Sequence, residues 1–124
     1  MRIVTARDAA SLLQPLFAGE DSECVGVLHL GAEQRLIAVT FSPPGEAEET
    51  DLPVADILAV ALKLGASAII LAHNHPSGDP APSEADRRAT RELAQMAGRL
   101  GIRLEDHLIL AGGRWESLRA LSLL

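Results

Sequence analysis

The sequence predicts an α/β fold, bordering on α+β, in which helices flank a mixed β-sheet. Segments with helical spacing of apolar residues alternate with short apolar runs of strand type, and this alternation is typical of layered α/β domains. The run ASAIILA at 66–72 lacks charge and is bounded by Gly65 and a His-Pro loop, so it predicts a central strand covered on both faces. The length of 124 residues suits a single domain, 1–124.

The first part of the chain predicts a helix and a β-hairpin. TARD at 5–8 has the spacing of a capping box, and apolar residues follow at helical intervals until Gly19. Pro15 is expected to end or kink this helix. The runs ECVGVLHL at 23–30 and RLIAVTF at 35–41 flank GAEQ and predict two strands around a turn.

A second helix is expected after an irregular segment. SPPGEAEETD at 42–51 combines Pro, Gly and acidic residues, which predicts a mobile surface loop. Asp51 is a candidate N-cap, with Pro53 in the first helical turn and Gly65 at the helix end. The expected buried stripe consists of Val54, Ile57, Leu58, Ala61 and Leu62.

The last third predicts a long helix followed by strands. The helix ends at Gly101 and carries Arg and Glu on its outer side. Beyond it we expect a strand, a second strand at 107–111, a turn at Gly112-Gly113, and a final strand or short helix. The expected buried stripe of the long helix consists of Ala85, Ala89, Leu93, Met96 and Leu100.

Charge and composition limit the classes of function. The formal net charge is −6, and the acidic excess lies in the first half, so direct nucleic-acid binding is not expected. An aromatic content of 2% also argues against base-stacking platforms. The arginines of the long helix and just after it predict a solvated face, with an anionic-ligand site as the alternative. They are Arg87, Arg88, Arg91, Arg99 and Arg103.

Cysteine usage and the start of the chain bear on the compartment. The single Cys24 cannot form an internal disulfide, and we interpret it as a small buried hydrophobe. MRIVTARDAA has no apolar stretch of signal-peptide type, and no run approaches the roughly 20 apolar residues that span a bilayer. The cytoplasm is the expected location, with no membrane partner, and assembly into a homo-oligomer stays open.

The stretch HNHPSGDPAPSEAD at 73–86 carries the strongest chemical signal. Side chains two apart on a strand share a face, so His73 and His75 can converge while Asn74 turns away. The Pro/Gly loop then swings the chain round, and Asp86 falls in the first turn of the following helix. Two imidazoles and a carboxylate with an open fourth position are typical of a catalytic zinc site.

Simpler interpretations of the same residues stay open. Ser83 and Asp86 also form an ordinary S-x-x-D helix start, in which Ser83 accepts a backbone N–H and Asp86 favours the positive helix end. An isolated H-x-H is more often incidental than metal-binding. Asp79 lies within the loop, and we interpret it as a turn residue.

The motif and its flanks resemble a known family. H-x-H-P-S-G followed by P-x-P-S-x-x-D closely resembles the JAMM (MPN+) metalloprotease signature, in the form seen in RadC-like JAB domains. GASAIILAHNHPSGDPAPSEAD and the later LGIRLEDHLILAGG look like the core of that family, and the resemblance extends over most of the chain. It implies a helix-flanked mixed-sheet sandwich of JAB/MPN type.

The resemblance also implies a function, that of a zinc-dependent metallopeptidase-like hydrolase acting on peptide or isopeptide bonds in a peptide or protein substrate. His73, His75 and Asp86 would hold Zn²⁺. Glu23 would accept a proton from the metal-bound water and pass it to the leaving amine, and Ser83 would steady the developing oxyanion. Such roles are coherent because the base must reach the water while a donor faces the carbonyl oxygen.

The assignment of Glu23 rests on the resemblance alone. ECVGVLHL is similar to the family's E-x-x-x-V-L-x-L, whereas spacing does not separate Glu23 from Glu20, Asp21 or Glu33. The pair Asp106-His107 resembles the family's D-H pair, so both residues are candidates for positions beside a metal ligand, with His107 as the partner that would orient it. A structural histidine is the alternative there.

Rival functions come from different classes. The string HNH suggests an HNH nuclease, but the residues of such enzymes are dispersed through a ββα unit. Zinc deaminases need a P-C-x-x-C pair, which a chain with one cysteine lacks. A non-catalytic JAB/MPN binding module and a DNA-repair-associated protein remain as alternatives. Full-length RadC-like proteins usually carry a helix-hairpin-helix segment, and the sequence before the first predicted strand is too short for one.

Overall fold

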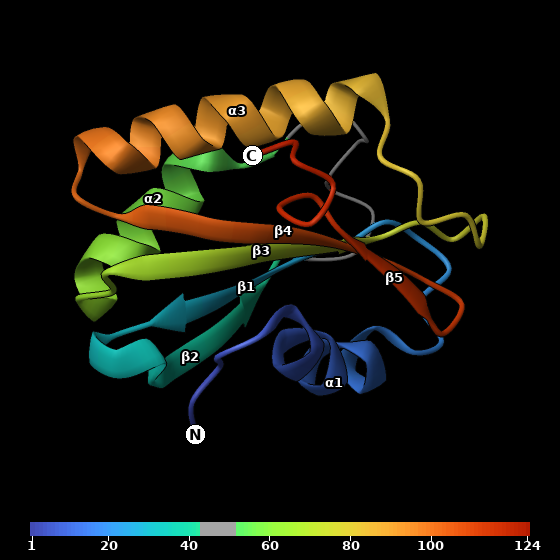
Figure 1. Ribbon diagram of the computed structural model, residues 1–124, viewed down its shortest axis with the longest axis horizontal. Coiled ribbons are helices and arrows are strands. Elements are labelled where there is room, and N and C mark those ends of the chain that lie inside the picture. Colours follow the sequence, from blue (N-terminus) through green and yellow to red (C-terminus); the bar gives the residue numbers. More distant parts are fainter. Residues whose placement is uncertain (43–51) are drawn as a thin grey trace.

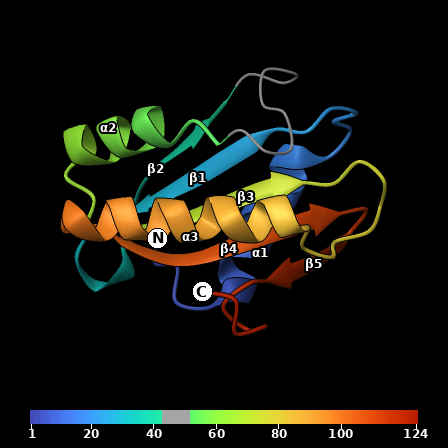
Figure 2. The same cartoon turned by 90° about the horizontal axis from the view of Figure 1, so that it is seen from above.

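A computed structural model describes residues 1–42 and 52–124, which build a five-stranded sheet between two helical layers (Figure 1). Viewed from above, α2 and α3 lie on the near face of the sheet and α1 lies behind it (Figure 2). The predicted α/β sandwich is therefore confirmed. The helices are α1 Ala6–Phe17, α2 Val54–Leu64 and α3 Glu84–Arg99, with a 3-10 turn at Ala32–Gln34. The strands are β1 Val25–Leu30, β2 Leu36–Phe41, β3 Ala68–Asn74, β4 Arg103–Ala111 and β5 Arg114–Ser117.

The sheet is mixed, in the order β2-β1-β3-β4-β5. β1 runs antiparallel to β2 and to β3, β3 runs parallel to β4, and β5 returns antiparallel to β4. Every residue of β3 is buried, as expected for a central strand with a helical layer on each face. The carboxyl end of β3 therefore opens at one edge of the sandwich, and this is where the histidine motif begins.

β4 is one strand of nine residues, so the predicted division before His107 is wrong. In the sequence, Glu105 and Asp106 look like a break between two strands, because acidic residues seldom occupy a buried strand. Asp106 is nevertheless buried, and its carboxylate accepts hydrogen bonds from the Ser117 hydroxyl and from the backbone N–H groups of His107 and Arg119. These bonds satisfy the carboxylate and let the strand continue.

The capping box predicted for α1 is present. Thr5 Oγ1 accepts a hydrogen bond from the Asp8 N–H, and the Asp8 carboxylate accepts one from the Thr5 N–H. Pro15 does not end the helix, which continues to Phe17. The Pro lies in the last turn, where little helix remains to be disturbed by its missing N–H.

α2 starts later than predicted. Its first residue is Val54, and Pro53 occupies the N-cap position instead of the first turn. Ile57, Leu58 and Ala61 are buried as expected, but Leu62 is 51% exposed. The expected cap Asp51 and nearly all of the loop predicted at 42–51 lie outside the described residues.

The buried face of α3 differs from the predicted one. Met96 and Leu100 are largely exposed, and Leu93 is the one predicted residue on the buried side, which otherwise consists of Asp86, Thr90 and Ala97. Hydrophobic periodicity alone missed this face because two of its four members are polar. The observed buried face is rotated about the helix axis relative to the predicted one, and Asp86 therefore points towards the end of β3.

Candidate metal centre

Four sequence-predicted residues meet at the end of β3. His73 is near the end of the strand, His75 follows it directly, and Asp86 points inward from the first turn of α3. Glu23 precedes β1, whose first residue, Val25, pairs with His73 in the antiparallel register. That pairing brings Glu23 next to the histidine motif across 50 residues of sequence.

The ligand atoms are close to one another. His73 Nε2 and His75 Nε2 are 2.9 Å apart, and they lie 3.2 Å and 3.3 Å from the two carboxylate oxygens of Asp86. A Glu23 carboxylate oxygen lies 4.0 Å from His75 Nε2. Glu23, His73 and His75 by themselves also have the spacing of a group that could hold a metal ion.

The capping box of α3 holds Asp86 in place. Ser83 Oγ accepts a hydrogen bond from the Asp86 N–H at 3.0 Å, and the Ser83 N–H donates to Asp86 Oδ2 at 2.8 Å. The helix-start interpretation and the ligand interpretation are thus compatible, because the carboxylate that caps the helix also faces the two imidazoles. Burial opposes ionisation of Asp86, but the two imidazoles beside the carboxylate and the hydrogen bond from the Ser83 N–H outweigh it and hold the pKa of the carboxyl well below its usual range.

The loop between β3 and α3 orients His75. Its Nδ1 lies 2.9 Å from the backbone carbonyl of Asp79, which can only accept, so Nδ1 carries a proton. The Asp79 carboxylate accepts the Ala81 N–H, in agreement with its interpretation as a turn residue. The hydrogen bond with Asp86 raises the pKa of His75 despite partial burial, so without a metal His75 shares a proton with Asp86.

The donor set fits zinc. A tetrahedral ion with bonds of about 2.0–2.1 Å holds its nitrogen and oxygen ligands about 3.3 Å apart, close to the separations among His73, His75 and Asp86. Two imidazoles and one carboxylate are ligands that zinc accepts, and three protein ligands leave a fourth position for water or substrate. The Glu23 carboxylate lies beside this group, 4.0 Å from His75 Nε2.

His107 extends the cluster inward. Its Nε2 lies 2.6 Å from His73 Nδ1, and its Nδ1 lies 2.6 Å from Thr90 Oγ1. Burial lowers the pKa of His107 well below its ordinary value, so the ring is neutral. Thr90 was missed in the sequence analysis. Its position four residues after Asp86 on the same helical face was the available signal.

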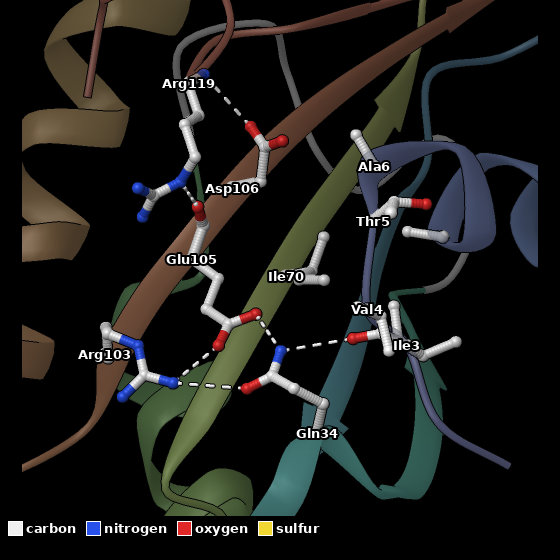
Figure 3. A pocket seen from close by; sticks show the side chains of 11 residues that line it. Ile3, Val4, Thr5, Ala6, Gln34, Ile70, Arg103, Glu105, Asp106 and Arg119 are labelled. Atoms are coloured by element: carbon white, nitrogen blue, oxygen red, sulfur yellow. Dashed lines mark hydrogen bonds and ion pairs between the residues drawn. The ribbon is translucent and has the colours of Figure 1, made fainter.

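Asp106 faces a different part of the molecule. It lines a cavity of about 320 Å³ in the layer of α1, together with Arg103, Glu105, Arg119 and Gln34 (Figure 3). The polar groups drawn there bond to one another: the Glu105 carboxylate accepts from both Arg103 and Gln34. The role predicted for Asp106 beside a metal ligand has no counterpart in these contacts, which anchor the C-terminal segment.

Two further residues with potentially reactive side chains, Cys24 and His29, lie in the interior. Cys24 is buried, and burial together with Glu20 raises the pKa of its thiol, so it remains protonated. His29 is fully buried, with its Nε2 2.8 Å from Thr40 Oγ1. Its Nδ1 is buried without a hydrogen-bond partner among the described residues, and burial lowers the pKa of the ring, so His29 is a neutral interior residue away from the cluster.

The fold and the cluster define a class: an α/β sandwich with a possible metal site at the end of its central strand. A model of the RadC-like JAB domain matches residues 3–123. The chain therefore belongs to the RadC-like JAB domain family, within the JAB/MPN superfamily, which includes metalloproteases.

Three curated relatives align with most of the chain. The chain is 36% identical over 118 residues to a UPF0758 protein of Salinibacter ruber, covering 95% of this chain and 51% of that protein. It is 41% identical over 107 residues to a UPF0758 protein of Rhodobacter capsulatus, covering 86% of this chain and 50% of that protein. A UPF0758 protein of Symbiobacterium thermophilum is 36% identical over 118 residues, with coverages of 95% and 50%. The chain spans about half the length of the curated relatives it matches.

Proposed function

We propose that the chain is a zinc-dependent hydrolase of peptide or isopeptide bonds. The observation that carries this proposal is the convergence of His73, His75 and Asp86 to within 2.9–3.3 Å, with Glu23 at 4.0 Å from His75. Zinc bound by the first three residues would lower the pKa of a coordinated water to about 7.

Glu23 and Ser83 have the chemistry for the two remaining roles. The Glu23 carboxylate accepts the proton released by the attacking water and delivers it to the leaving amine, which is general base and then general acid catalysis. Ser83 Oγ accepts the Asp86 N–H in the helix cap. Its own hydroxyl proton is therefore left for the carbonyl oxygen that becomes negative in the transition state.

A cavity beside the cluster offers room for substrate. It measures about 470 Å³ and adjoins His75 and Pro76, within the range of about 300–1,000 Å³ that is usual for ligand pockets. Its apolar walls include Phe17 and Leu110, and the Gly112-Gly113 turn lies at its rim. Asn74 also lines this cavity, which therefore lies on the α1 side of the sheet and meets the cluster at His75, so we expect a peptide or protein substrate to reach it from the metal past His75.

Other aspects of the proposal concern partners and location. Within the described residues, 1–42 and 52–124, no helix has the length and apolar character needed to cross a bilayer. We propose a cytoplasmic protein that binds neither membranes nor nucleic acid directly, and the number of subunits is left to experiment.

The test combines metal analysis with hydrolysis. Wild type is expected to retain about one zinc per chain after dialysis and to cleave peptide or isopeptide substrates. Glu23→Gln keeps the side-chain shape and should retain zinc while the hydrolysis rate falls by about 10²–10⁴. A wild type that binds zinc but cleaves nothing would support the non-catalytic binding module. DNA nicking by a metal-free sample would support the nuclease alternative.

A further inference from the structure

Thr90 lies in the interior of the domain, one helical turn after Asp86, and contacts two polar groups at once. Its Oγ1 is 2.6 Å from the backbone carbonyl oxygen of Asp86 and 2.6 Å from His107 Nδ1. His107 Nε2 is in turn 2.6 Å from His73 Nδ1. These four residues form a continuous line of contacts, which we name the Thr90 chain.

The donor and acceptor of each hydrogen bond follow from the carbonyl oxygen of Asp86, at which the Thr90 chain begins. The Asp86 carbonyl can only accept, so the Thr90 hydroxyl donates to it. With its proton committed, Thr90 Oγ1 accepts from His107, and His107 Nδ1 therefore carries the proton of the neutral ring. His107 Nε2 is then an acceptor, and it receives the proton of His73 Nδ1.

We propose that Thr90 is a positioning residue of the metal centre, acting through His107 to fix the tautomer of His73 so that its Nε2 lone pair faces the metal ligands. The inference rests on the proposed zinc site. In the opposite tautomer, His73 Nε2 would carry a proton directed at His75 Nε2 and the Asp86 carboxylate, 2.9 Å and 3.2 Å away. That proton would occupy the place of the cation.

Burial of Thr90 and His107 fixes the donor and acceptor of each hydrogen bond in the Thr90 chain. Thr90 is 0% exposed and His107 is 1% exposed, so water cannot readily replace either partner when a bond is reversed. The Thr90 hydroxyl bonds to the carbonyl four residues earlier, which is a common local choice for Thr on a helix and turns the remaining lone pair outward from the helix. Neighbouring strands supply the two histidines, since β3 and β4 run side by side in parallel.

The arrangement also couples two ligands. The Thr90 chain begins on the main chain of Asp86 and ends on the ring of His73, and both residues contribute atoms to the cluster. A shift of the first turn of α3 would therefore disturb the hydrogen bonding of His73 as well as the carboxylate. The neutral, protonated-Nδ1 form of a ligand histidine is commonly set by such partners.

The test compares isosteric and conservative variants of Thr90. Thr90→Val keeps the shape and removes the hydroxyl, whereas Thr90→Ser keeps the hydroxyl. The ring-nitrogen NMR signals of metal-free protein report the tautomers, and competition with a chromophoric chelator reports the zinc Kd. We expect His73 to carry its proton on Nδ1 in wild type and in Thr90→Ser. In Thr90→Val we expect the other tautomer to appear and zinc binding to weaken about 10–100-fold.

Thr40→Val is the matched control. It removes the hydroxyl beside another buried histidine, because Thr40 Oγ1 lies 2.8 Å from His29 Nε2 on the β1–β2 pair. Zinc affinity and the His73 signals should be unchanged in it. A Thr90→Val protein with the wild-type tautomer and zinc Kd would overturn the proposal, as would a wild-type His73 protonated on Nε2. The tautomer measurement needs neither zinc nor hydrolysis, so an inactive wild type refutes the proposed hydrolase while the NMR signals still decide the role of Thr90.

Discussion

The side-chain Oδ1 of Asn74 accepts a hydrogen bond from the backbone N–H of Cys24 at 2.7 Å. The Nδ2 group of the same amide donates to the carbonyl oxygen of Ser22 at 3.1 Å. One amide therefore holds the chain on both sides of Glu23. Asn74 stands between the two motif histidines and points to the opposite face of β3, so a single strand end presents imidazoles on one side and positions the candidate base from the other.

Asn74→Ala should separate base positioning from metal binding. Loss of one buried and one partly buried hydrogen bond should lower the free energy of unfolding by about 1–3 kcal/mol, measured by urea denaturation. Zinc content should persist because His73, His75 and Asp86 are untouched, while the hydrolysis rate falls. Gln34→Ala is the control: its amide also joins distant groups, Ile3 O and Glu105, but away from the cluster. Equal hydrolysis rates in the two variants would contradict this role of Asn74.

Asp86→Asn should discriminate between a metal ligand and a simple helix cap. The amide retains an oxygen for capping but loses the charge that pairs with the imidazoles, so zinc affinity should fall by more than about tenfold. Asp79→Asn is the comparison, because this loop carboxylate accepts a backbone N–H and its main-chain carbonyl, not its side chain, contacts His75. Titration with zinc checks both variants. Similar affinities in the two would count against Asp86 as a ligand.

Local sequence patterns predicted the parts of the site that are adjacent in the chain. A strand end, a Pro/Gly loop and an S-x-x-D helix start are short-range features, and they place His73, His75 and Asp86 with few alternatives. Spacing along the sequence could not identify Glu23, because its proximity to the histidines depends on the register of β1 against β3. Only the family resemblance selected it from the neighbouring acids.

Two errors in the predicted fold, at α3 and at β4, have a common physical cause. Periodicity arguments assume that buried positions are apolar, whereas Thr90 and Asp106 are buried polar residues with satisfied hydrogen bonds. Because Thr90 is polar, the predicted buried face of α3 was misplaced. Because Asp106 is acidic, β4 was predicted as two strands. Both residues belong to hydrogen-bond networks that link distant segments, which a linear pattern does not display.

The stability of the metal-free protein should depend on pH through His75. Its pKa is raised above 6.5 in the folded state, so its contribution is fully present below pH 6.5 and is lost as the pH rises through the folded pKa. The pKa of Asp86 is lowered below 3.8, so its contribution is present above pH 3.8 and is lost as the pH falls through the folded value. The pair should therefore stabilise the metal-free fold most between these limits.

Urea unfolding of metal-free wild type and His75→Gln checks this dependence. The stability difference between the two proteins should shrink from pH 5.5 to pH 8.5 as His75 loses its proton, from about one unit below to about two units above an ordinary histidine pKa. Zinc binding near pH 6 should release the proton shared by His75 and Asp86, which calorimetry in buffers of different ionisation enthalpy would detect. A difference that grows with pH would contradict the assigned direction.

Ser83 and Thr5 allow capping to be separated from chemistry, because both residues form the same capping box on different helices. Thr5 Oγ1 accepts from Asp8 and Ser83 Oγ accepts from Asp86, at 3.1 Å and 3.0 Å. Ser83→Ala and Thr5→Ala should each lower the free energy of unfolding by about 0.5–2 kcal/mol. Only Ser83→Ala should also lower kcat, by about 10²–10³ if its hydroxyl stabilises the oxyanion. Unfolding curves and hydrolysis rates measured on the same samples make the comparison. If the two variants lose activity in proportion to stability alone, Ser83 acts as a helix cap and the oxyanion requires another donor.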